Sequence, residues 1–248
     1  MPLISSFRRP GGLTAATAVL LLGATASISN AQMPTPDLSG IWSITRYEAA
    51  LKPADKSAIP LSPQGKSLYA ANQQALKAKS PNADTATSLC VPHGVPRSLT
   101  TPYPYRLYQS GAQITFIHEA NRAFRLVAVT DKHADQTTWD PSFMGDGIAR
   151  WEQDTLVIET TNFNDKTWLD DTGLPHSDQL RVTERLRLVS KGEQLEDTIT
   201  IEDPGVFTRA WTTKLSFKRR NNVHIVTDSI CGQPRRDVSD IPGAKAFR

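Results

Sequence analysis

Three ionisable residues interrupt the apolar alternation of neighbouring segments near the C-terminal end of the chain. Glu184 stands among the apolar residues that alternate along 180–188, and Asp197 interrupts the next segment in the same way. Arg209 stands among the aromatic residues that alternate along 207–217. Because alternate residues of a strand share a face, all three side chains are expected to point into an apolar interior. Burial without a partner is costly, so they should meet each other, a ligand or water.

A hairpin that pairs Val189 with Gln194 makes Glu184 and Asp197 diagonal neighbours, about 7 Å apart on the inner face. Arg209 on the following strand could reach either carboxyl group. Desolvation beside a second carboxylate raises a pKa, which suits a general acid or base. The alternative is a buried ionic network that fixes the register of the strands.

His176 lies in a loop shortly before the strand that carries Glu184, and Ser177 and Asp178 follow it. A histidine beside an inward carboxylate could shuttle protons, so we predict His176 and Glu184 as acid and base, with Asp197 and Arg209 tuning them. A serine-hydrolase triad is a second interpretation, although the chain has no GxSxG nucleophile motif. Capping or surface placement is the third.

Other side chains are candidates for holding a substrate. Trp168 and Trp211 are first of all core residues and secondly ring platforms for a ligand. Arg97 follows a proline-rich turn and is a candidate for binding a carboxylate, as are Arg122 and Arg125, which could instead pair with Glu119. His118 shares a strand face with Ile114 and Phe116 and is interpreted as a core residue. The predicted substrate-binding residues are Trp168, Trp211, Asp178, Arg97 and Asp203.

Metal binding would be another use for these side chains. His93, His133 and His176 could meet Asp146 or Asp178, yet no HExxH or comparable local pair exists. A nucleotide-binding glycine loop, a haem motif and a flavin signature are also absent from the sequence. We therefore predict no metal and no cofactor.

The elements that must position these residues are short strands joined by short turns. A helix is expected from the N-cap Ser62 to about Lys79, mostly polar and on the surface. Two longer connections, 131–146 and 162–179, carry aromatic residues and resemble the mouth of a pocket. The predicted strands are 39–44, 105–109, 113–119, 123–130, 147–152, 155–160, 180–189, 194–202, 207–219 and 223–229.

This order of elements predicts a mainly β protein in which an antiparallel meander closes into a barrel. A barrel of about eight strands can hold one small ligand. The pair Gly40-x-Trp42 on the first strand resembles the start of lipocalin-like (calycin-type) barrels. A folded-over sandwich is the alternative.

The first 31 residues have the layout of a secretory signal peptide. Arg8 and Arg9 precede an apolar stretch of about 16 residues, which is short for a membrane anchor. We predict a signal peptide at 1–31, a single barrel domain at 32–248, and a periplasmic or secreted protein. Removing the leader takes two of the 28 Lys and Arg residues and leaves 26 against 25 Asp and Glu. This near-neutral balance argues against nucleic acid or a membrane as a partner of the mature chain.

Both cysteines, Cys90 and Cys231, lie in the predicted mature chain and would meet an oxidising compartment. A disulfide between them is the expected outcome, with free thiols as the alternative.

Several motifs together resemble a large group of exported bacterial proteins. They are Asp37-Leu38-Ser39-Gly40-Ile41-Trp42, Cys90-x-Pro92-x-Gly94-x-Pro96-Arg97, Arg150-Trp151-Glu152-x-Asp154-Thr155-Leu156-Val157, His176-Ser177-Asp178 and Glu202-Asp203-Pro204. The resemblance implies export and a shared fold rather than a particular reaction. It draws attention to His176, Asp178 and Asp203. Gln153 departs from the pattern, which has a glycine in that turn.

These features predict an exported, cofactor-independent enzyme of the lyase or isomerase type, which transfers protons on a small, partly aromatic molecule in a barrel pocket. The alternatives are a periplasmic carrier of an apolar small molecule, a hydrolase, and a structural or interaction module. The expected partner is a small-molecule ligand or substrate.

Overall fold

The structure, a computed structural model, describes residues 35–135, 137–226 and 238–244. The predicted signal peptide at 1–31 and Cys231 lie outside these residues, so the signal and the disulfide with Cys90 remain predictions. Within the described ranges, every helix is too short or too polar to cross a bilayer.

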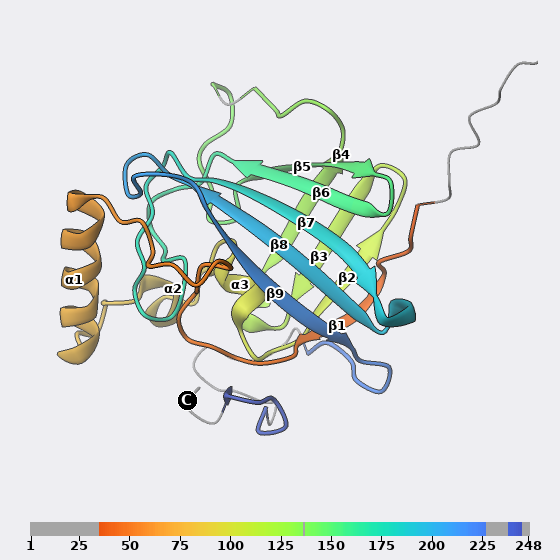
Figure 1. The fold of residues 1–248 in the computed structure, drawn as a ribbon, viewed down its shortest axis with the longest axis horizontal. Helices are drawn as coiled ribbons and strands as arrows, with labels where there is room; N and C mark the ends of the chain where they lie inside the picture. Colours follow the sequence, from red (N-terminus) through yellow and green to blue (C-terminus); the bar gives the residue numbers. More distant parts are fainter. Residues whose placement is uncertain (1–34, 136, 227–237, 245–248) are drawn as a thin grey trace, which may run out of the picture. The chain divides into compact units, whose positions relative to one another are not determined.

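Nine strands close into one barrel, in which each strand pairs with the next along the chain and the last pairs with the first (Figure 1). The predicted fold class, a mainly β protein built on a lipocalin-like barrel, is confirmed. Closure pairs the edges that an open sheet would expose. The strands are β1 Gly40–Ile44, β2 Tyr105–Gln109, β3 Gln113–His118, β4 Phe124–Val129, β5 Asp146–Glu152, β6 Thr155–Thr161, β7 Arg181–Val189, β8 Gln194–Glu202 and β9 Trp211–Arg219.

One pair of neighbouring strands departs from the predicted antiparallel meander. β4 and β5 run parallel, with Val127 opposite Gly147 and Val129 opposite Ala149. A parallel pair needs a connection that returns the chain to the other end of the sheet, and the long segment 130–145 provides it. The long connection predicted here therefore has a topological role.

The predicted surface helix is α1, Pro63–Lys77, which ends two residues earlier than expected. The Oγ atom of Ser62 accepts a hydrogen bond from the N–H of Gly65 at 3.0 Å, and Pro63 fits the first helical position. The segment between α1 and β2 contains two short helices. The remaining helical segments are α2 Thr85–Ser88, α3 Arg97–Thr100, and the 3-10 turns η1 Ala120–Arg122 and η2 Ser190–Gly192.

The two ends of the barrel differ in how the strands are connected. Tight turns join β2 to β3, β5 to β6 and β7 to β8 at one end, which we call the tight-turn end (Figure 1). Here Trp42 is fully buried, and the guanidinium of Arg219 lies 4.4 Å from its ring centroid. The opposite, long-loop end gathers the connections 45–104, 162–180 and 203–210.

The final predicted strand is not formed in the part that is described. Residues 223–226 have no strand pairing, and the remainder of 223–229 lies outside the described residues. The barrel therefore closes through β9, whose Phe217 pairs with Ile44 of β1.

Candidate functional site

Glu184 and Asp197 both point into the barrel, as predicted. Their exposed fractions are 0% and 1%. The predicted hairpin register is also observed, because Leu186 pairs with Asp197 and Glu184 pairs with Ile199. The two carboxyl groups are therefore diagonal neighbours on the inner face.

The cation that meets Glu184 is Arg125 of β4, which reaches across the interior. Its Nη1 donates to Oε1 of Glu184 at 2.9 Å, and its Nη2 forms the second ion pair with Oε2. Nη2 also donates to Oγ1 of Thr160 at 2.7 Å. The guanidinium carbon lies 5.1 Å from the ring centroid of Phe116. A bidentate pair of this kind fixes the orientation of both side chains.

The prediction that Arg209 faces inward is wrong. Its side chain is exposed, and the strand expected to hold it begins only at Trp211. The preceding residues instead form a turn, in which the N–H of Phe207 donates to the carbonyl of Asp203 at 2.7 Å. Thr208 then bonds to the carbonyl of Pro60. Because these bonds replace the barrel ladder, the alternation of sides does not extend to Arg209.

Asp197 has an environment that favours its neutral form. Burial and the neighbouring Glu184 carboxylate raise the pKa of Asp197 well above its usual value, against the opposing effects of Arg125 and the N–H of Arg185. That N–H donates to Oδ1 at 3.2 Å, whereas Oδ2 is buried without a hydrogen-bond partner among the described residues. The proton of the neutral carboxyl group therefore belongs on Oδ2.

Tyr105 and His118 pair across β2 and β3, and their ring centroids are 5.6 Å apart. Burial, followed by the charges of Asp197 and Glu184, raises the pKa of Tyr105 well above its usual value, so the phenol stays neutral. Burial and then Arg125 lower the pKa of His118 to about 3, against a backbone hydrogen bond to Ser98. The imidazole is therefore neutral as well.

These side chains form what we call the lumen cluster: Tyr105, His118, Arg125, Glu184 and Asp197. Among the described residues, four of its buried atoms have no hydrogen-bond partner. They are Tyr105 Oη, His118 Nε2, Arg125 Nε and Asp197 Oδ2. Buried polar atoms in native proteins are nearly always hydrogen-bonded. Several unbonded atoms in one cluster therefore mark a place for a ligand or for water.

His176 is buried at the long-loop end, with both ring nitrogens in hydrogen bonds. Nε2 lies 2.9 Å from Oγ1 of Thr167, and Nδ1 lies 3.1 Å from the carbonyl oxygen of Ser177. Burial lowers the pKa of His176, against the opposing effects of the Ser177 backbone, Asp203 and Asp165. These contacts orient the loop, and the structure does not place His176 in the lumen cluster.

Asp203 and Asp178 lie in two different loops at the long-loop end and differ in burial. Asp203 is 2% exposed and accepts hydrogen bonds from the N–H and Oγ–H of Ser177 at 2.6 and 2.7 Å, and from the N–H of Gly205 at 3.0 Å. Asp178 is exposed. The contacts of Asp203 hold two loops together, as expected of a structural carboxylate.

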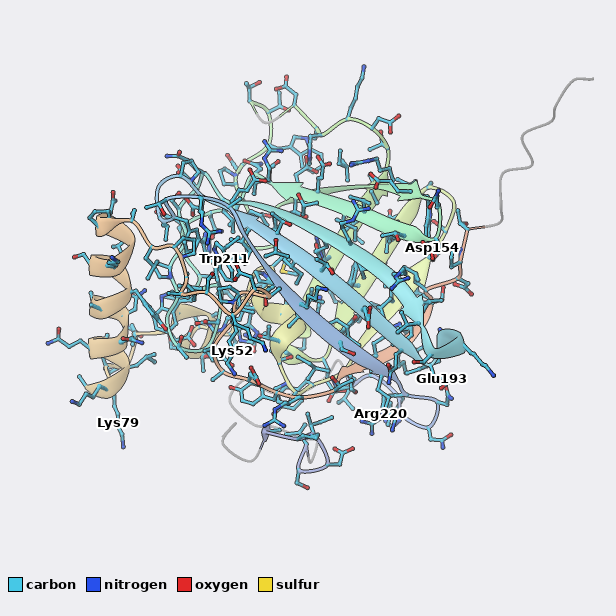
Figure 2. The ribbon with its side chains drawn as sticks, viewed as in Figure 1. Lys52, Lys79, Asp154, Glu193, Trp211 and Arg220 are labelled. Carbon is cyan, nitrogen blue, oxygen red and sulfur yellow. The ribbon has the colours of Figure 1, made fainter. Side chains whose placement is uncertain are left out.

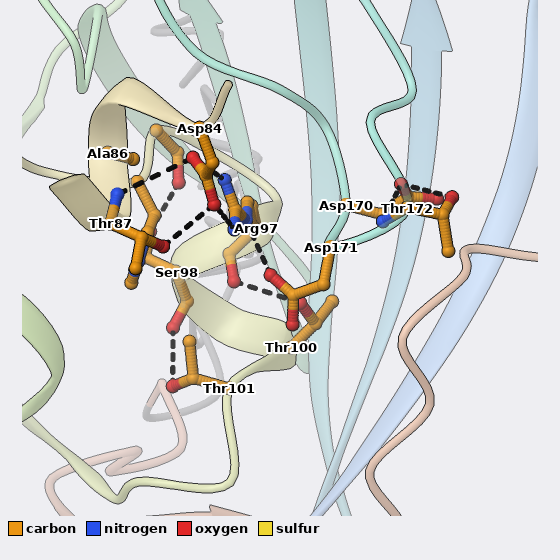
Figure 3. Close-up of polar contacts among 12 residues, drawn as sticks. Asp84, Ala86, Thr87, Arg97, Ser98, Thr100, Thr101, Asp170, Asp171 and Thr172 are labelled. Atoms are coloured by element: carbon orange, nitrogen blue, oxygen red, sulfur yellow. Dashed lines mark hydrogen bonds and ion pairs between the residues drawn. The ribbon is translucent and has the colours of Figure 1, made fainter. Parts of the chain in front are cut away.

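Arg97 and Trp168 belong to a second group around a buried cation, which we call the loop cluster: Asp84, Arg97, Trp168 and Asp171. Arg97 forms two hydrogen bonds with Asp84, at 2.9 and 2.6 Å, and one with Asp171 at 2.6 Å (Figure 3). Its guanidinium carbon lies 5.8 Å from the ring centroid of Trp168. Burial acts to raise the pKa of Asp84, but Arg97 outweighs it and brings the pKa to about 2. Arg97 thus binds carboxylates of this chain.

Trp211 is buried at the start of β9, at the long-loop end (Figure 2). Its ring packs edge-on against Phe207 at 5.6 Å, and its Nε1 has no hydrogen-bond partner within the described residues. In the register of the sheet, Trp211 opposes Ile201, one inner-face step from the row of Glu184 and Ile199. Trp211 therefore lies between the lumen cluster and the loops.

The histidines and aspartates considered as alternative metal ligands do not gather into a site. In the described ranges no three His, Cys, Asp or Glu residues are placed to hold a metal ion. Two of them do meet, because His133 Nδ1 lies 3.0 Å from Oδ2 of Asp146.

One pocket, of about 200 Å³, lies away from the lumen cluster. Ser43 of β1, two prolines that precede β2 and the segment 238–241 line it, together with the ion pair of Arg220 and Asp240 at 3.2 Å. None of the predicted site residues lines this pocket. We therefore place the candidate site in the lumen, where the unbonded polar atoms lie.

Sequence reasoning assigned no catalytic role to Tyr105, Arg125 or His118. Arg125 was considered only as a carboxylate binder or a partner of Glu119, although Ala123, Arg125 and Val127 share the alternation that places Glu184 inside. The same period of two locates Tyr105 beside Leu107. The sequence pattern shows which residues face inward, but it does not show which of them meet across the barrel.

Fold and site together define a lipocalin-like barrel with an ionisable interior. Comparisons with protein-family models and with curated proteins found no match to this chain. The function is therefore argued from the lumen cluster itself.

Proposed function

We propose that the protein is an exported, cofactor-independent enzyme that transfers protons on a small, partly aromatic molecule bound in the barrel, in an elimination or an isomerisation. One observation carries this proposal. The carboxyl group of Asp197 is fully buried, its Oδ2 has no partner among the described residues, and the adjacent Glu184 carries the charge that meets Arg125. A carboxyl group kept neutral in this way is suited to donate a proton.

The side chains of the lumen cluster take different roles in this proposal. Asp197 is the general acid through Oδ2. His118 is the proton acceptor through Nε2, because the backbone bond to Ser98 assigns its own proton to Nδ1. Tyr105 donates a hydrogen bond, and Arg125 with Glu184 sets the local field. An acid and an acceptor in one cluster can move a proton between two atoms of a bound molecule.

The loop residues predicted as site residues have a supporting role. Trp211 and Phe207 provide an aromatic wall between the lumen and the long-loop end. His176, Asp203 and Arg97 hold the loops at that end through the contacts described above. Arg209 and Asp178 are exposed, and we assign them no part in the reaction.

A carrier of an apolar molecule is the second candidate. The aromatic rings that surround Tyr105 favour it, since Phe116 and Phe217 lie 5.8 and 5.3 Å from the Tyr105 ring centroid. Such walls bind a flat apolar ligand whether or not a reaction follows.

The experiment is incubation of the mature protein with a library of small aromatic compounds, followed by mass spectrometry of retained and converted species. For wild type we expect at least one compound to be converted. Asp197→Asn should lower that conversion about 100-fold or more, the usual contribution of a general acid. The amide keeps an oxygen that can accept from Arg185, so the fold should remain.

Asp178→Asn is the matched control, because it removes a carboxyl group from the surface and should leave conversion unchanged. Conversion at wild-type rate by Asp197→Asn would refute the assignment of the acid. Retention of compounds without any conversion would favour the carrier. Neither retention nor conversion would count against both candidates.

A further inference from the structure

Two neutral O–H groups of the lumen cluster have unused hydrogen-bonding capacity. Tyr105 Oη and Asp197 Oδ2 are buried, and neither has a hydrogen-bond partner in the described part of the chain. Tyr105 is 2% exposed and Asp197 1%. The Tyr105 ring lies 5.3 Å from the ring of Phe217 on β9, and Asp197 pairs with Leu215, two residues before Phe217 on the same strand. Both groups therefore belong to the same part of the barrel interior.

The chemistry of these groups selects what they bind. A phenol and a neutral carboxyl group each donate one hydrogen bond, and the unbonded Nε of Arg125 can only donate. Donors that converge in a site shielded from water stabilise negative charge that develops on an oxygen atom. A neutral carboxylic acid beside a tyrosine is a known arrangement for holding an enolate-like oxygen. The ligand should therefore present an oxygen acceptor.

The charge balance of the cluster limits the ligand further. Arg125 and Glu184 form an ion pair, and the effects on His118 and Asp197 favour their neutral forms. A charged ligand would bring an unpaired charge into this balanced interior, at a large desolvation cost. An uncharged ligand avoids that cost.

The rings beside Tyr105 indicate the shape of the ligand. The Phe217 ring meets Tyr105 edge-on at 84°, and the Phe116 ring stacks on His118 with an interplanar angle of 8°. Flat apolar surfaces of this kind pack well against an aromatic ring.

From these contacts we infer that the lumen binds an uncharged aromatic carbonyl compound, whose carbonyl oxygen accepts hydrogen bonds from Tyr105 Oη and Asp197 Oδ2. This inference rests on the proposed active site and specifies its substrate class. In an isomerisation of a β,γ-unsaturated member of this class, His118 Nε2 takes a proton from the carbon next to the carbonyl. The electron pair of that C–H bond forms a C=C bond, and the π pair of the carbonyl moves onto the oxygen under the two donors. The proton then returns from His118 to the far carbon of the conjugated system as the carbonyl re-forms, so that atoms and charge balance.

The test measures the equilibrium binding of acetophenone to the full chain. Calorimetry gives the affinity, and the infrared carbonyl stretch of the bound compound reports the hydrogen bonds to its oxygen. We expect binding, with the carbonyl stretch at lower frequency than in water. α-Methylstyrene, which has a methylene group in place of the oxygen, and benzoate, which is charged, should both bind at least tenfold more weakly. Tenfold corresponds to about 1.4 kcal/mol, which is the scale of one hydrogen bond.

Tyr105→Phe removes one donor and should weaken acetophenone binding about tenfold and reverse part of the frequency shift. Its fold should persist, because the hydroxyl that is lost has no partner among the described residues. Tyr108→Phe, on the exposed side of the same strand, is the matched control and should change neither measurement. Asp197→Leu removes the second donor and should act like Tyr105→Phe.

Acetophenone binding that is unchanged in both Tyr105→Phe and Asp197→Leu would overturn the inference, as would tighter binding of benzoate or no binding of acetophenone. Failure of this inference can be distinguished from failure of the proposed enzyme. A shifted carbonyl stretch without conversion of any library compound would support this ligand class and remove the reaction. Conversion of compounds that lack a carbonyl would support the enzyme and reject this ligand class.

Discussion

Arg97 and Arg125 are both buried, yet their surroundings differ in one respect. Arg97 is 3% exposed and Arg125 is 2% exposed. Arg97 binds two carboxylates, and the second of these, Asp171, also accepts a hydrogen bond from the Tyr47 hydroxyl at 2.8 Å. Arg125 binds one carboxylate, and a second carboxyl group, Asp197, remains nearby with an unbonded oxygen.

This difference separates a structural cluster from a candidate site. Every charged group of the loop cluster is used in contacts within the chain, and none of the buried atoms without a partner in the described residues belongs to it. The lumen cluster keeps four such atoms. Unused hydrogen-bonding capacity lowers the stability of the fold, so four such atoms in one cluster point to a ligand or water in that cluster.

The largest effect is expected when the loop cluster loses its cation. Arg97→Met leaves the half-buried Asp84 and Asp171 without their main partner, which should lower the free energy of unfolding by about 3 to 5 kcal/mol. Urea unfolding monitored by circular dichroism measures this loss. At a temperature where the variant is still folded, acetophenone binding should equal that of wild type. A loss of less than about 1 kcal/mol would contradict the structural role of the loop cluster.

A double variant tests the corresponding ion pair of the lumen cluster. Arg125→Met should lower the free energy of unfolding by about 3 kcal/mol, because Glu184 is left as an unpaired buried charge. Adding Glu184→Gln removes that charge and should restore about 2 kcal/mol or more. Unfolding of both single variants and the double variant completes the cycle. Additive losses would mean that the two residues do not act as a pair.

Acid sensitivity compares one buried histidine from each region. Burial lowers the pKa of His118 to about 3 and, near the loop cluster, that of His93 to about 4, whereas the unfolded chain takes up these protons near pH 6.5. Each histidine therefore stabilises the fold above pH 6.5, and this contribution falls by about 1.4 kcal/mol per pH unit as the solution becomes more acidic.

Each of the variants His118→Gln and His93→Gln should therefore remove one histidine's share of the pH dependence of stability between pH 6.5 and 4.5. Melting experiments across that range measure the change. Below pH 4 only the slope of His118 should continue. Identical pH profiles for wild type and both variants would exclude these shifts.

A pH dependence of the opposite sign is expected from Asp197 alone. Its pKa is raised in the folded protein, so its contribution is fully present below about pH 3.8 and is lost as the pH rises toward the folded-state pKa. Over that window, the free energy of unfolding of the wild type should fall by up to about 1.4 kcal/mol per pH unit relative to that of Asp197→Asn. Denaturant titrations of both proteins at several pH values measure the difference. A gap that stays constant with pH would show that Asp197 is not neutral in the fold.

Much of the fold could be predicted because its signals are local. The alternation around Glu184 and Asp197, the turn residues and the N-cap Ser62 each act within a few residues of the chain. Arg209 shows where this reasoning fails, since its segment has the same alternation but bonds to Pro60, far away in sequence. The prediction of an antiparallel pair at β4 and β5 was wrong for the same reason. The direction of β5 depends on the path of a long connection and not on local residues.

The sequence by itself determined that Glu184 and Asp197 face the interior, since the period of a strand decides which side chains share a face. Only the tertiary structure decided that Arg125, and not Arg209 or His176, meets them. Arg125 and Glu184 are 59 positions apart on strands that do not pair with each other, and closure of the barrel brings them together. The physical reason is that an inward direction is a property of each strand, whereas the partner across the lumen depends on the register and closure of all nine strands.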